Sequence, residues 1–154
     1  MTATGPTDLI SVLMSDHREV ERLFAELEAR EGTVEHRREL VDHVITEVAS
    51  HVIIEETWMF PVFRTYVEGG DRIADQEMKE HVETERVMKE LEGLSPAESH
   101  FEELLSRFIA DIRRQIECEE NEIFPELGKA CPPERLRELG EKALHAKETA
   151  PTRP

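Results

Sequence analysis

The chain has 154 residues, the length of about one domain. Its 35 acidic side chains against 19 lysine and arginine side chains give a formal net charge of −16 at pH 7. This surplus argues against binding to nucleic acid or to an anionic membrane surface, because both need clustered cations. No apolar stretch reaches the roughly 20 residues of a membrane span, and residues 1–6 lack the features of a secretory signal.

Cysteine and glycine usage points to a helical protein of a reducing compartment. Cys118 and Cys131 are too few for a disulfide framework, and Cys118 lies within a helical pattern. We therefore expect a cytoplasmic protein. The chain has only seven glycines and few strand-like runs, which favours an all-α fold.

The first two predicted helices cover about residues 8–30 and 34–66. Thr7 and Thr33 are suitable N-caps, because a threonine hydroxyl can accept a hydrogen bond from a free N–H of the first turn. Pro61 should kink the second helix, since proline removes one backbone hydrogen bond. The apolar residues of these two helices recur at helical spacing. They are Leu9, Leu13, Val20, Phe24 and Leu27 in the first helix, and Leu40, Val44, Val48, Met59 and Val62 in the second.

The next two long helices are expected over about residues 71–92 and 96–127. A short fifth helix should follow over about 134–145, and residues 149–154 should form a frayed tail. The inward-facing residues are predicted to be Ala74, Met78, Met88 and Leu91 in the third helix, and Phe101, Leu105, Phe108 and Ile112 in the fourth.

Long helices joined by short loops predict an up-down-up-down four-helix bundle. We expect residues 1–154 to form a single domain, with the bundle over about residues 8–127 and the short fifth helix after it.

An internal repeat with an offset of 64 residues relates the two halves of the bundle. Residues 16–23 align with 80–87, and residues 51–61 align with 115–125. The bundle is thus expected to consist of two helical hairpins related by a pseudo-two-fold axis, each contributing matching positions to one centre.

The repeat isolates four positions on predicted inner faces, each followed by a glutamate four residues later. Residues i and i+4 share one face of a helix. Burying a bare carboxylate costs several kcal/mol unless a cation accompanies it, and these faces carry no lysine or arginine. Imidazole and carboxylate together suit iron or manganese. The pairs are His17 with Glu21, His51 with Glu55, His81 with Glu85, and Gln115 with Glu119.

A simpler interpretation competes with this one at each position taken alone. A histidine on an apolar stripe is more often a hydrogen-bonded core residue, but the same feature in register on four helices favours a metal site. Glu21 lies beside Glu19 and Arg22, so we expect it at a wetted edge rather than at the metal. Other glutamates near the motifs are interpreted as solvated, namely Glu56, Glu117, Glu120 and Glu122.

Four motifs together resemble the hemerythrin-like (HHE cation-binding) family over about residues 8–127. They are Asp16-His17, His51-x-x-x-Glu55-Glu56 with Phe60-Pro61, Glu80-His81, and Glu119-Glu120-x-x-Ile123-Phe124-Pro125.

The resemblance implies a non-haem di-iron centre inside the bundle, with Glu55 and Glu119 as bridging carboxylates and an oxo or hydroxo group as a further candidate bridge. His17 and His51 would bind one iron, and His81 would bind the other. Members of this family bind or process dioxygen, nitric oxide or peroxide, so the implied partner is a small diatomic or peroxide ligand.

The chain departs from the family pattern around the second iron. Gln115 stands where the family usually has a histidine, and Glu85 stands where oxygen-carrying members have a second histidine on the third helix. The second iron would then have His81, Glu85 and at best a weak amide oxygen from Gln115. Such a harder and more open site favours ferric iron and admits peroxide.

Two hypotheses of different classes follow. In the first, the chain is a di-iron protein of oxidative-stress defence or sensing, with catalase-like turnover as one form of its chemistry. No catalytic residue is expected beyond the metal ligands, which are His17, His51, Glu55, His81, Glu85 and Glu119. In the second, Gln115 marks a degenerate site, and the bundle is a metal buffer or an interaction module for a basic partner.

Overall fold

A computed structural model describes residues 7–149 of the chain. Within that range it is built from α-helices and two single π-helical turns, with no strand. None of these helices is both long and apolar enough to cross a membrane. The elements are α1 (Leu9–Ala29), α2 (Val34–Ile54), η1 (Glu55–Met59), α3 (Phe60–Tyr66), α4 (Gly70–Gly93), α5 (Ser99–Cys118), η2 (Glu119–Ile123), α6 (Phe124–Ala130) and α7 (Pro133–Thr149).

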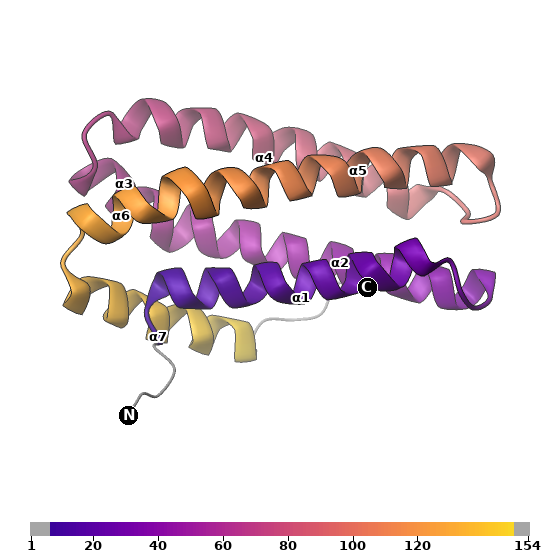
Figure 1. Cartoon of the computed structure of the whole chain (residues 1–154), viewed down its shortest axis with the longest axis horizontal. Helices are drawn as coiled ribbons and strands as arrows, with labels where there is room; N and C mark the ends of the chain where they lie inside the picture. Colours follow the sequence, from indigo (N-terminus) through magenta and orange to yellow (C-terminus); the bar gives the residue numbers. More distant parts are fainter. Residues whose placement is uncertain (1–6, 150–154) are drawn as a thin grey trace.

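The long helices α1, α2, α4 and α5 pack side by side in the up-down-up-down order that the sequence predicts (Figure 1). Helices α3 and α6 continue α2 and α5 past the π-helical turns, so each pair forms one long rod. The fold class predicted from the sequence is therefore confirmed. The predicted fifth helix is present as α7 and is longer than the 134–145 expected. It lies along α1, and the tail beyond Thr149 falls outside the described residues.

Local hydrogen bonds explain where the helices begin. Asp8, rather than the predicted Thr7, caps α1, because its side chain accepts a 2.8 Å hydrogen bond from the N–H of Ser11. Thr33 caps α2 as predicted, accepting a 3.1 Å bond from the N–H of His36. Helix α5 begins at Ser99, three residues later than predicted, because the residues before it form a turn.

Pro61, predicted to kink the second helix, follows a π-helical turn instead, and so does its repeat mate Pro125. The N–H of Phe60 bonds to the carbonyl of Glu55, and the N–H of Phe124 bonds to that of Glu119, five residues back in each case. The wider turn lets the rod continue past a proline, which has no N–H to donate. The two turns are repeat mates, and each begins at a predicted bridging glutamate.

The apolar side chains form two clusters along the bundle, and the predicted metal ligands lie between them. One cluster fills the end around Phe24, Leu91 and Phe101. The other fills the end around Leu13 and Met59 and extends onto α7. The site is thus enclosed by packed side chains on both sides, which keeps it dry and fixes its geometry.

Helix α7 approaches the start of α1 so closely that Gly140 is required there. A Cβ at this position would lie 1.8 Å from the carbonyl oxygen of Thr7. We expect Gly140→Ala to lower the free energy of unfolding by about 2 kcal/mol, as overpacking does. Gly128→Ala is the matched control, because its Cβ would meet only the Ile10 side chain at 3.6 Å. Thermal melting of both variants checks this, and equal melting temperatures would contradict it.

Candidate metal centre

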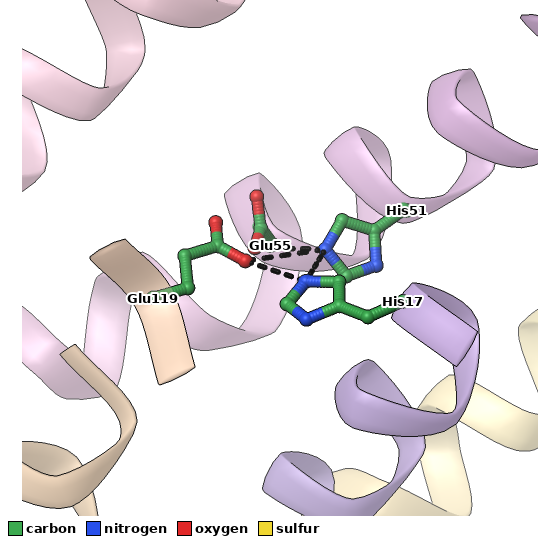
Figure 2. Close-up of side chains that lie close together, drawn as sticks. All are labelled: His17, His51, Glu55 and Glu119. Atoms are coloured by element: carbon green, nitrogen blue, oxygen red, sulfur yellow. Dashed lines mark hydrogen bonds and ion pairs between the residues drawn. The ribbon is translucent and has the colours of Figure 1, made fainter. Parts of the chain in front are cut away.

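Three histidine side chains direct their Nε2 atoms into the space between the long helices. The Nε2 atoms of His17 and His51 lie 3.2 Å apart. Figure 2 shows these rings, from α1 and α2, facing Glu55 and Glu119. The Nε2 atom of His81, on α4, lies 3.0 Å from Oε1 of Glu55. The structure therefore brings five of the predicted ligands together.

The opposite ring nitrogen of each histidine meets a carboxylate on the outer side. Such a carboxylate accepts the Nδ1–H and leaves the Nε2 lone pair directed at the centre. Glu56 and Glu120, interpreted from the sequence as solvated residues, are two of these partners, and they are half-buried. The pairs are His17 with Glu120 at 2.7 Å, His51 with Asp16 at 3.0 Å, and His81 with Glu56 at 2.8 Å.

In this arrangement the lone pairs of two imidazole nitrogens and a carboxylate oxygen face one another. With Nδ1–H donated outward, the Nε2 atoms of His17 and His51 face each other as acceptors, with Oε1 of Glu119 at 2.8 Å and 3.5 Å from them. Protons or a metal cation must therefore lie among these atoms. Imidazole nitrogens bind an ion such as zinc at about 2.0–2.1 Å, so a 3.2 Å separation allows both to bind one cation.

Glu55 extends between the two sets of histidines. Its Oε2 atom lies 3.0 Å from Nε2 of His51, while its Oε1 atom lies 3.0 Å from Nε2 of His81. Oε2 is the only fully buried side-chain oxygen or nitrogen in the described part of the chain that lacks a hydrogen bond. A carboxylate with one oxygen toward each imidazole, and one oxygen unsatisfied, fits a bridge between two cations.

The buried charges within residues 7–149 are acids and histidines, with no lysine or arginine among them. Burial opposes ionisation of Glu55, but the charge of His51 and hydrogen bonds to Glu119 and the histidines hold its pKa well below its ordinary value. Burial and the charge of Glu55 raise the pKa of Glu119. Burial lowers the pKa of His81, but its bonds to Glu55 and Glu56 outweigh this and raise it to about 9. Without metal, protons thus compensate part of the negative charge.

The Phe-Pro motifs support the same histidines. Phe124 stacks on His17 with ring centroids 5.6 Å apart, and Phe60 stacks on His81 at 5.4 Å. These pairs are related by the 64-residue repeat. Each π-helical turn therefore supplies an inner carboxylate and an outer carboxylate for a histidine Nδ1, and the helix that follows it begins with a phenylalanine that packs on that same histidine.

Two predicted positions around the second metal form no hydrogen bond with the converging histidines and glutamates within residues 7–149. The amide of Gln115 donates a 3.2 Å hydrogen bond to Oγ1 of Thr84, although its side chain also lines the cavity at the centre. Glu85 is half-buried in a groove between α2 and α4, and no hydrogen bond or ion pair joins it to the described residues. Glu21 is paired with Arg113 at 3.0 Å, at the wetted edge predicted for it.

Glu77 is a buried acid that the sequence analysis missed. It lies one helical turn before His81, on the inner face, and is 6% exposed, whereas Met78, predicted to face inward, is 37% exposed. Burial and the charges of Glu119 and Glu55 raise the pKa of Glu77 to about 8, so it lies close to the centre. Its spacing of four residues from His81 indicates the inner face, but Met78, three residues from His81, fits that face by spacing as well.

A small apolar cavity of about 30 Å³ adjoins the centre. A water molecule needs at least about 10–15 Å³ by this measure, so the cavity suits a ligand of a few atoms. Its walls include the histidines, the two bridging candidates and Gln115, together with Val20, Val48, Val52, Ile112 and Ile116.

Comparison with known proteins identifies the family of the chain. Residues 8–127 match the family described as hemerythrin HHE cation binding domain. The chain belongs to this hemerythrin family. The crystal structure of a hemerythrin HHE cation binding domain-containing protein, the Rv2633c homolog from Mycobacterium kansasii, has the same fold, with a TM-score of 0.78 and 22% identity, covering 92% of this chain and 85% of that one. No curated protein matches the sequence.

Helix α7 lies beyond the part of the chain that matches the hemerythrin family. It nevertheless reaches the site, because Lys147 forms an ion pair with Asp16, the carboxylate that accepts from His51. In this hemerythrin-family chain, the C-terminal helix thus supports the orientation of one predicted metal ligand.

Proposed function

We propose that this hemerythrin-family protein holds two iron ions between its four long helices. The convergence of histidine Nε2 atoms and buried carboxylate oxygens, with no basic side chain among them, is the observation that carries this proposal. Glu77 takes the place first given to Glu85, because it is buried and close to the other acids. The proposed ligands are His17 and His51 for one ion, His81 and Glu77 for the other, and Glu55 and Glu119 as bridges.

The proposed chemistry is binding of, or reaction with, dioxygen, nitric oxide or hydrogen peroxide. A di-iron pair can accept and return two electrons, which is the capacity that peroxide removal requires. The chain's own residues orient the imidazoles through Asp16, Glu56 and Glu120 and exclude bulk water with an apolar wall. Gln115 in place of a histidine leaves one ion with a weaker or open position, which favours peroxide reaction or sensing in the cytoplasm over stable oxygen transport.

The second candidate function is a metal buffer or interaction bundle with an incomplete site. The bond from the amide nitrogen of Gln115 to Thr84 favours it, because this bond holds the amide in place of an imidazole and leaves only a weak oxygen ligand at that position. Under this alternative the protein would bind fewer than two ions and would show no reaction with peroxide.

Absorption spectroscopy of the iron-loaded protein distinguishes the two functions. We expect charge-transfer bands in the near ultraviolet that change on addition of azide or hydrogen peroxide, because both ligands fit the small cavity. The double variant His17→Ala/His51→Ala should lose the bands. A loaded protein whose spectrum is unchanged by azide and peroxide would contradict the proposed chemistry.

A further inference from the structure

A groove of about 850 Å³ runs along the outer side of α4, α5 and α6. It is distinct from the small cavity at the centre. Five carboxylates line it against two basic side chains, so its electrostatic potential attracts cations. The acids are Asp75, Glu77, Glu80, Glu122 and Glu126, and the bases are Arg72 and Lys79.

Glu77 connects this groove with the buried centre. It lines the groove although only 6% of the residue is exposed, and no hydrogen bond or ion pair within residues 7–149 satisfies its carboxylate. It is also close enough to Glu119 and Glu55 for their charges to affect it. An unpartnered, nearly buried carboxylate that lines a groove one helical turn before His81 can pass a cation from the groove to the centre.

Glu122 stands at the exposed end of the same path. Among the described residues it has no hydrogen bond or ion pair. The other three acids each lie near a basic side chain: Asp75 is 2.7 Å from Arg64, Glu80 is 3.5 Å from Arg114, and Glu126 is 3.6 Å from Lys129. Cys118, also in the groove, is near both free acids, since burial and then the charges of Glu77 and Glu122 raise the pKa of its thiol to about 11. The two free acids thus flank one segment of the groove.

A second groove near the centre, which is also lined by His81, suits a cation less well. The groove between α2 and α4, about 570 Å³ in volume, has Glu56 and Glu85 balanced by Arg86 and Lys89, and its other walls are largely apolar. The acids of the α4–α5–α6 groove do not converge on one point. Within residues 7–149, the group whose ligand atoms lie close enough together to hold a metal ion is the one at the centre, with His17 and His51. Spaced carboxylates of this kind suit passage of an ion rather than its storage.

We propose that the α4–α5–α6 groove is the route by which divalent iron reaches the buried centre, with Glu122 and Glu126 attracting the ion and Glu77 receiving it. This inference rests on the proposed function, since it requires a centre that is loaded with metal from solution.

Anaerobic stopped-flow loading of the metal-free full chain with ferrous iron tests the route. The variant Glu122→Gln/Glu126→Gln removes two charges at the groove. Its matched control, Glu103→Gln/Glu117→Gln, removes two exposed charges of α5 outside the groove. At low salt we expect the groove variant to load about fivefold more slowly than the control, with a smaller salt dependence, because electrostatic attraction is reduced.

Equilibrium measurements separate a route from a ligand site. A route predicts that chelator-driven release slows by the same factor as loading, so that the two variants keep equal iron content and affinity. Equal loading rates of the groove variant and the control would overturn the proposal, and so would lower iron content in the groove variant alone. If the unmodified chain takes up no iron, the proposed function itself fails, which is a different result from either of these.

Discussion

Removing bound metal with a chelator should lower the melting temperature by about 10 °C. A ligand present at 1,000 times its dissociation constant stabilises the native state by about 4 kcal/mol, and each kcal/mol moves the melting temperature of a chain of this size by about 2–4 °C. The physical cause is the buried acids of the centre, Glu55, Glu77 and Glu119, which have no lysine or arginine among the buried side chains of residues 7–149 to balance them. Differential scanning calorimetry of loaded and stripped protein measures the shift.

The variant Glu117→Gln is the control for this experiment, because Glu117 is exposed and lies on the same helix. It should show the same shift as the unmodified chain. Identical melting of loaded and stripped protein would favour the metal-free interaction bundle instead.

The Glu77→Gln variant should bind only one of the two ions, whereas the Glu85→Gln variant should bind both. An amide oxygen is a weaker ligand than a carboxylate, and even outer-shell substitutions lower metal affinity by about 10–100-fold, so we expect a loss of at least about 100-fold for the second ion. The two variants remove the same charge from the same helix and differ in burial, since Glu77 is buried and Glu85 half-buried. Isothermal titration with ferrous iron under anaerobic conditions gives both stoichiometry and affinity.

Melting of the metal-free Glu77→Gln protein distinguishes lost ligation from lost folding. Removing an unpaired buried acid should leave the metal-free stability unchanged or raised. Retention of two ions by Glu77→Gln, together with loss of one by Glu85→Gln, would restore the ligand set first expected from the sequence.

The fold was predictable because helical periodicity and the 64-residue repeat both indicate two hairpins. The same repeat predicts that five of the proposed ligands lie near one another, namely His17, His51, His81, Glu55 and Glu119. Both signals depend on regular spacing, which an α-helix maintains over many turns.

The residues of the site that the sequence did not predict lie where the helical spacing is irregular or where a neighbouring residue is more apolar. Met78 is more apolar than Glu77, and both lie three or four residues from Ala74 and His81, so spacing alone does not decide which of them faces inward; the structure buries the glutamate. Glu56 and Glu120 follow the bridging glutamates directly, and successive residues of an α-helix differ by about 100° in direction. The π-helical turns alter this register, so that both glutamates of each pair reach the histidines. The contact of Lys147 with Asp16 depends on how α7 packs, which no local pattern indicates.

The most direct measurement is the iron content of the reconstituted protein, combined with anomalous diffraction at the iron edge. The account predicts two irons per chain, with both anomalous peaks beside Glu55 and one of them beside His17 and His51. Well under one iron per chain after reconstitution, with only water and protein hydrogen bonds joining the imidazoles, would contradict it.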